Sequence, residues 1–363
     1  MSERGAAAPA EGLGFRRPGL EFPAGAGDNP SPGRPKGKPS ARKTQALGRP
    51  GTRLAILGGL ALACIAVYLL GDLSGNLNYI LGRRAITLAT LVVVAAAIGV
   101  STVLFHTVTA NRILTPSIMG LDSLYMALQT VAVFTLGAFG APRLPPPVLF
   151  GGQLGAVVLF SLILFSVVMG RYSSSLTMML LVGVLIGGLF RGLSSFLQRL
   201  MSPEDFQVLS DRFFADFTGA DPALLGLSSA IVVTLTAAAW WFRHELDVVG
   251  LGRDLAICLG INHRRVTMIV LVGVALLVGT STALVGPTMF FGLLASHLAY
   301  RALGTQRHAW TIPGTILAGT IALVGGQWAF ERVLGLAGSL SMIVEFVGGI
   351  TFIILLLAGG RRR

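Results

Sequence analysis

Three ionisable side chains lie inside long apolar stretches of the sequence: Asp122, Arg191 and Glu345. A charged side chain that faces lipid at the middle of a bilayer costs about 2.5–3.5 kcal/mol or more. Each must therefore point into the protein, toward water or toward an opposite charge. Such residues are candidates for a translocation path, and structural pairing is the alternative. Both interpretations stay open, because no relay of ionisable residues at helical spacing accompanies the three.

The other reactive residue types do not form a catalytic or metal-binding set. Neither His106 nor His297 has a cysteine or carboxylate at ligand spacing, so we predict no metal site and interpret both as helix-packing histidines. The stretch nearest to a nucleotide-binding loop, 37–39, has proline where Ser or Thr would bind Mg²⁺. We therefore predict no catalytic residue and no ATPase activity, which leaves a membrane-embedded enzyme as the weakest functional class.

Long apolar segments are the elements that must position these residues. Only 12% of the 363 residues are charged, against about 25% in soluble domains. About 20 helical residues cross a bilayer core, and backbone inside lipid must satisfy its own hydrogen bonds. We predict an all-α polytopic membrane protein with about ten transmembrane helices. Their expected ranges are 53–71, 85–108, 117–138, 147–169, 176–198, 222–242, 265–285, 287–303, 312–330 and 341–358.

The charge distribution divides the chain and orients it. Residues 1–52 are basic and rich in Pro, Gly and Ala, which predicts a disordered cytosolic tail beside anionic lipid rather than a nucleic-acid-binding segment. Residues 53–360 form the predicted transmembrane domain. Lys and Arg are more frequent in the connections on the side of this tail, so we predict that both termini are cytosolic.

The connection 202–221 has the pattern of an amphipathic helix at the outer surface. Ser202 is a favourable N-cap, and Pro203 suits the first helical position. Its apolar residues recur at helical spacing: Phe206, Leu209, Phe213 and Phe217. The segment either seals the bundle or gates an outer vestibule.

The connection 244–265 predicts a second amphipathic helix, on the cytosolic side. Its apolar stripe consists of Leu251, Leu255, Cys258 and Leu259. Gly260 is a helix stop, and Arg264 and Arg265 mark the return to the membrane. The stripe packs either against the protein's own helix ends or against a cytosolic partner.

Small residues on the segment 176–198 favour close helix contact. They are Gly183, Gly187, Gly188 and Gly192. Their spacing of four and five residues predicts packing within the subunit or across a dimer interface.

Several short motifs occur in one order along the chain. They are Leu251-Gly252-Arg253-Asp254, Leu259-Gly260-Ile261-Asn262, Arg264-Arg265-Val266, Val285-Gly286-Pro287, Phe290-Phe291-Gly292-Leu293, His297-Leu298-Ala299, Arg307-His308 and Ile312-Pro313-Gly314. This order resembles the iron-siderophore and vitamin B12 (FecCD-type) permease family of ABC importers over roughly residues 54–358. The segments 111–116 and 325–332 are most similar to the iron-chelate branch.

The resemblance implies a permease subunit in the cytoplasmic membrane of a prokaryote. The implied cargo is a ferric siderophore. Its transport would be driven by ATP hydrolysis on separate subunits. ATP and Mg²⁺ would therefore bind to the partner ATPase, and no cofactor would bind to this chain. The implied partners are a second permease subunit, identical or not, two cytosolic ATPase subunits and an extracytoplasmic substrate-binding protein. The rival from another class is a secondary transporter coupled to protons or Na⁺ through Asp122 or Glu345.

The resemblance also implies three sets of site residues. The cytosolic coupling helix, within 251–263 and its flank, would present Leu251, Arg253, Asp254, Leu255, Leu259, Gly260, Arg264 and Arg265. The binding protein would dock on Arg83, Arg84 and Arg332, for which interfacial anchoring is the alternative. The translocation path would include Asp122, Arg191, Phe213, Phe217 and Glu345.

Overall fold

Apolar helices dominate the residues that the computed structural model describes, which are 49–71, 77–137, 145–171, 176–334 and 340–360. Nearly all of the predicted tail, residues 1–48, lies outside them, and the first helix begins at Pro50. The helices are α1 (Pro50–Leu70), α2 (Leu77–Thr109), the 3₁₀ turn η1 (Pro116–Met119), α3 (Leu121–Leu136), α4 (Pro146–Arg171), α5 (Leu176–Gln198), α6 (Pro203–Asp211), α7 (Pro222–Trp241), α8 (Arg243–Val249), α9 (Arg253–Cys258), α10 (His263–Val285), α11 (Phe291–Leu303), α12 (His308–Ala329), the π-helical turn η3 (Phe330–Leu334) and α13 (Leu340–Gly360).

The helices confirm the predicted all-α polytopic architecture. Within the described ranges, seven helices are long and apolar enough to cross a membrane, namely α1, α2, α4, α5, α7, α10 and α12 with its π-helical extension. The shorter apolar helices α3 and α13 occupy two further predicted positions. The tenth position belongs to α11, which has 13 residues.

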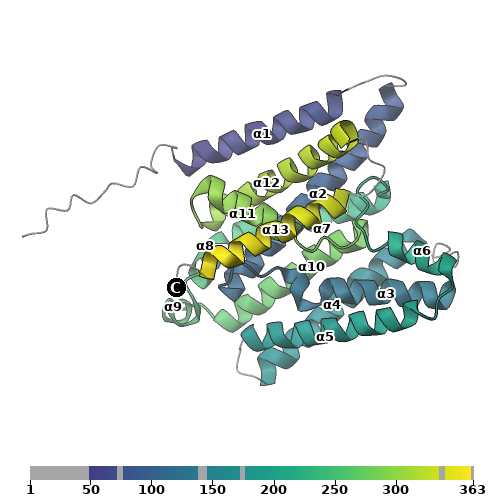
Figure 1. Cartoon of the computed structure of the whole chain (residues 1–363). Coiled ribbons are helices and arrows are strands. Elements are labelled where there is room, and N and C mark those ends of the chain that lie inside the picture. Colours follow the sequence, from purple (N-terminus) through teal and green to yellow (C-terminus); the bar gives the residue numbers. More distant parts are fainter. Residues whose placement is uncertain (1–48, 72–76, 138–144, 172–175, 335–339, 361–363) are drawn as a thin grey trace, which may run out of the picture. The chain divides into compact units, whose positions relative to one another are not determined.

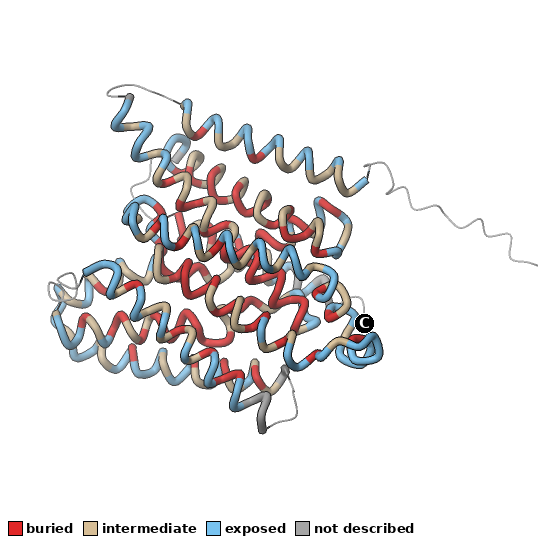
Figure 2. Tube along the Cα trace, turned by 180° about the vertical axis from the view of Figure 1, so that it is seen from behind, coloured by how far each residue is buried: buried red, intermediate tan, exposed pale blue. Residues whose placement is uncertain are grey.

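Helix α2 lies at the centre of the bundle. It packs along α12, α10 and α11, and its residues Leu91, Val94 and Phe105 are fully buried. One outer edge is formed by α1, which packs on α12, and α5 lies at another edge against α3 (Figure 1). Buried residues accordingly concentrate in the middle of the bundle, while the outer faces of α1 and α5 are exposed (Figure 2). These apolar outer faces suit a lipid or subunit environment.

The short helices mark two opposite ends of the bundle (Figure 1). The α9 end carries α8 and α9, together with the start of α12 and the end of α11. The α6 end carries α6 and the last turn of α1. Arg53, in the first turn of α1, donates from Nη1 to the carbonyl oxygen of Leu303 over 3.0 Å, which holds the start of α1 at the α9 end.

Four helices begin four or more residues from their predicted starts. Helix α3 starts at Leu121 rather than at 117, because the 3₁₀ turn η1 precedes it. Helix α2 starts at Leu77, eight residues before 85, because Arg83 and Arg84 lie within the helix and interrupt the apolar run that marks a span. Helix α11 starts later than predicted, at Phe291. Gly286 has φ +107°, which ends α10 and leaves a short non-helical segment before α11. Helix α12 starts early, at His308, with Pro313 inside it.

The predicted glycine contact exists on one side of α5. A Cβ added to Gly187 would lie 2.9 Å from the Cα of Gly120, and one added to Gly183 would lie 2.9 Å from the carbonyl oxygen of Met119. Gly120 itself has φ +86°, a conformation that favours glycine. Nothing lies within 4 Å of such a Cβ on Gly188 or Gly192. The glycines therefore join α5 to the start of α3 within the subunit.

Candidate functional site

The predicted amphipathic helix at the α9 end is split into α8 and α9. Gly252, with φ +103°, separates the two helices. Helix α9 ends at a Schellman motif: Gly260 N–H donates to Ile257 O over 2.9 Å, and Ile261 N–H donates to Ala256 O over 3.0 Å. Gly260 has φ +84°, so the predicted helix stop is confirmed. Residues 250–263, with α9 at their centre, are called the coupling segment below.

The coupling segment turns its large apolar side chains outward. The side chains of Leu251, Leu255, Ile257 and Leu259 are between 52% and 60% exposed, and Ala256 is the fully buried member of α9. The stripe therefore does not pack on the protein's own helix ends.

The charged members of the predicted coupling set surround the exposed apolar side chains. Arg253, Asp254, Arg264 and Arg265 are exposed as well. A cavity of about 570 Å³ lies between α9 and the start of α10, bordered by Arg253 and Arg264. An apolar face with a charged rim is a composition typical of protein interfaces.

Two of the three predicted docking arginines meet at the α6 end. Arg84 donates from Nη1 to the carbonyl oxygens of Leu69, over 3.1 Å, and Gly71, over 2.5 Å. Arg332 donates from Nη2 to the same Gly71 oxygen over 3.2 Å. Both arginines thus bond to carbonyl groups at the end of α1 that have no partner within the helix. Arg83 lies in α2, not in a loop before it, and is exposed.

Three of the five predicted path residues lie near one another. Asp122 lies in the first turn of α3 and is 2% exposed, and its carboxylate makes no hydrogen bond of full geometry, although the Ser117 side chain lies within reach. Arg191 on α5 is exposed and donates from Nη1 to Ser123 Oγ over 2.7 Å, beside Asp122. Glu345 lies on α13, is half-buried, and is close enough to Asp122 for the two carboxylates to interact electrostatically.

Helix α6 is shorter than its apolar pattern predicts. Helix α6 ends at Asp211, so Phe213 and Phe217 are not on it, and Phe217 is 2% exposed. Beyond the end of α6, Phe217 lies in a turn in which the Asp216 carboxylate accepts from the N–H groups of Thr218 and Gly219. Asp216 N–H also donates to Val285 O over 2.8 Å, which fastens this turn to the end of α10. The predicted N-cap is confirmed, since Asp205 N–H donates to Ser202 Oγ over 3.2 Å.

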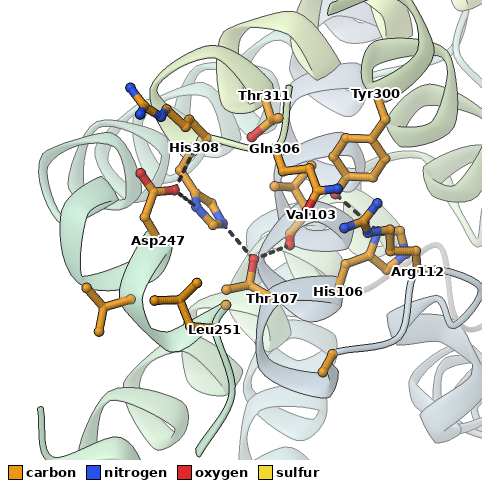
Figure 3. A pocket seen from close by; sticks show the side chains of 14 residues that line it. Val103, His106, Thr107, Arg112, Asp247, Leu251, Tyr300, Gln306, His308 and Thr311 are labelled. Carbon is orange, nitrogen blue, oxygen red and sulfur yellow. Dashed lines mark hydrogen bonds and ion pairs between the residues drawn. The ribbon is translucent and has the colours of Figure 1, made fainter. Parts of the chain in front are cut away.

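A polar cluster at the α9 end was not predicted. It joins Asp247 of α8, His308 of α12 and Thr107 of α2 beside a cavity of about 450 Å³ (Figure 3). Tyr300 of α11 and Arg112 line the same cavity, with the guanidinium carbon 5.6 Å from the ring centroid. These residues come from separate parts of the sequence, so no spacing pattern could reveal them.

Comparisons with known proteins agree with this architecture. A model of the FecCD transport family matches residues 54–358. The chain is 43% identical over 305 residues to the petrobactin import system permease protein YclO of Bacillus subtilis, covering 84% of this chain and 96% of that one. It is 32% identical over 275 residues to the petrobactin import system permease protein FatC of Bacillus anthracis, covering 76% and 78%. A solved structure of a metal-chelate type ABC transporter in an inward-facing conformation has the same fold, with a TM-score of 0.72 at 21% identity over 85% of this chain and 99% of that one.

Proposed function

The chain belongs to the FecCD transport family, and from this premise we propose that it moves a ferric siderophore across the cytoplasmic membrane. The chain is a multi-pass membrane permease of an ABC importer and not an enzyme. ATP binds to the ATPase partners of such a permease, and a binding protein delivers the cargo. The observation that carries the cargo class is the similarity of 84% of this chain to a petrobactin import permease at 43% identity.

The coupling segment is the proposed contact with the ATPase subunits. Its exposed leucines, at 56% for Leu255 and 60% for Leu259, supply apolar area that water disfavours. The Schellman motif at Gly260 holds the end of α9 in one conformation, which suits a surface that must transmit force. With the α9 end in the cytosol, ATP hydrolysis below it would rock two permease subunits between outward-open and inward-open states.

Asp122, Arg191, Phe213, Phe217 and Glu345 remain the proposed lining of the translocation path. Two observations support part of this set: Arg191 is exposed, and the buried Asp122 carboxylate makes no hydrogen bond of full geometry. Burying a polar group without a good hydrogen bond costs free energy. A second conformation in which the Asp122 carboxylate gains a hydrogen-bond partner would therefore be more favourable for this residue. Phe217 is buried in the present conformation and would reach a path only after the turn at Asp216 moves.

Uptake of labelled iron tests the cargo class. Cells that carry this chain together with its ATPase and binding protein should accumulate iron from ferric petrobactin, and cells without the chain should not. Labelled vitamin B12 serves as the matched control, because the family also contains vitamin B12 permeases. Accumulation of vitamin B12 with no accumulation of ferric siderophore would contradict the proposal.

Arg83 gives the cleanest test of the proposed binding-protein surface. Arg84 and Arg332 hold the end of α1, so reversing their charge would also disturb that helix. Arg83→Glu should weaken capture of the binding protein, and more strongly at low salt, since screening reduces interactions between exposed charges. The measurement is binding-protein affinity at two ionic strengths, with Arg301→Glu as a control in which an exposed arginine at the opposite end of the bundle is reversed. Unchanged affinity in Arg83→Glu would leave Arg83 as an interfacial anchor only.

A further inference from the structure

The coupling segment has few buried side chains of its own through which to move the bundle. Helix α9 exposes Leu255 and Ile257 and buries Ala256. Helix α8, directly before it, is different, because Leu246 and Val249 are each 2% exposed. A displacement of the coupling segment therefore reaches the membrane helices by two routes, through the chain into α10 and through α8.

Asp247 on α8 is bonded to the first residue of α12. Its Oδ1 accepts from the backbone N–H of His308 over 2.8 Å and lies 2.5 Å from Nδ1 of the same residue. The N-cap residue of α12, Arg307, makes no side-chain capping bond. Asp247 thus caps α12 from another helix, and its negative charge faces the positive end of the α12 dipole.

The ring of His308 extends this link to α2. Its Nε2 lies 2.6 Å from Thr107 Oγ1, and that hydroxyl also lies 2.9 Å from the carbonyl oxygen of Val103. A hydroxyl has one proton to donate. If Thr107 donates to Val103 O, the ring carries a proton on both nitrogens and donates Nε2–H to Thr107. If the ring is neutral with its proton on Nδ1, Thr107 donates to Nε2 instead. The ring donates Nδ1–H to Asp247 in both arrangements, so the link from α8 to α2 persists.

We propose that Asp247, His308 and Thr107 form a clasp that carries displacement of the coupling segment into α12 and α2. The three are positioning residues that link the coupling segment to the bundle. Helices α12 and α2 pack along each other in the middle of the bundle. A displacement of these two helices would therefore move the core of the bundle. The neighbouring cavity of about 450 Å³ leaves one side of the clasp without packed side chains (Figure 3). The inference rests on the proposed function, because it presumes that force enters at the coupling segment.

The test compares transport with ATP hydrolysis in the complete importer. Proteoliposomes would contain the permease, the ATPase subunits and the binding protein, with ferric petrobactin as the cargo. Asp247→Asn should lower the iron imported per ATP hydrolysed by about tenfold. A hydrogen bond to a charged group changes an equilibrium constant by about tenfold or more, and this variant removes the charge. Thr107→Val removes a hydroxyl and should lower the ratio by about threefold. Co-purification of the ATPase should stay unchanged in both variants, and the melting temperature should fall only by the few degrees that a lost cap or hydrogen bond costs.

Two control variants separate the clasp from general damage. Glu245→Gln removes a charge two residues earlier on α8, and Thr109→Val removes a hydroxyl that bonds to Phe105 O on its own helix. Both controls should import iron per ATP as the wild type does. An unchanged ratio in both clasp variants would overturn the proposal. So would a loss of ATPase co-purification in parallel with transport, or an equal fall in the controls. Failure of the proposed function has a different signature, since the wild-type importer would then show no ATP-driven uptake of ferric siderophore.

Discussion

Replacing both Leu255 and Leu259 with aspartate is expected to uncouple ATP hydrolysis from uptake while the permease still inserts into the membrane. Both side chains are more than half exposed in the isolated subunit, so the change removes little of its own packing. If the two leucines are buried against the ATPase, each contributes about 1.5–3 kcal/mol. Losing both should weaken ATPase binding by about a hundredfold or more. Co-purification and ATP-driven iron uptake measure the effect.

His244→Asp is the matched control for this pair. It places a new acidic group on an exposed position of α8, in the first turn, where the helix dipole tolerates it. Uptake by this control should equal that of the wild type. Normal uptake by the Leu255 and Leu259 variant would remove the docking surface from the account.

Gly187→Ala is expected to destabilise the subunit, because its added Cβ would lie 2.9 Å from backbone of α3's N-cap residue, Gly120. Neither backbone can yield by rotating a side chain. Overpacking of this kind costs about 1–3 kcal/mol. The melting temperature in detergent should therefore fall by several degrees, and α3 with its buried Asp122 should shift relative to α5.

Gly188→Ala is the control at the next residue of the same helix. A Cβ at Gly188 meets nothing within 4 Å, and alanine is a better helix former than glycine by about 1 kcal/mol. Its melting temperature should stay the same or rise. Equal melting temperatures for the two variants would show that the contact between α3 and α5 does not hold the subunit together.

Local patterns in the sequence predict the local features of this structure. Apolar runs of bilayer length locate the long helices, Ser202 locates the start of α6, and Gly260 locates the end of α9. Each of these signals lies within a few residues of its effect, because hydropathy, N-capping and a left-handed glycine act over one or two helical turns.

Features that depend on distant residues could not be predicted. The early start of α12 at His308 depends on Asp247, which is 61 residues away. Arg84 and Arg332 meet only because α1 brings the Gly71 carbonyl between them. The spacing of glycines on α5 likewise does not indicate which of them face a neighbouring helix. In the structure, Gly183 and Gly187 are the ones that contact the start of α3. The helical pattern failed at Phe217 because the Asp216 carboxylate accepts from the N–H groups of Thr218 and Gly219, which a continued helix would bond to its own carbonyl groups.

The direct test of ATP-powered import is uphill iron transport into vesicles with and without the ATPase subunits. Vesicles with the complete importer, the binding protein and ATP should concentrate iron from ferric petrobactin. Vesicles that contain this chain alone should show none under a proton or Na⁺ gradient. Uphill uptake by the chain alone on an ion gradient would contradict the account and would favour a secondary transporter coupled through Asp122 or Glu345.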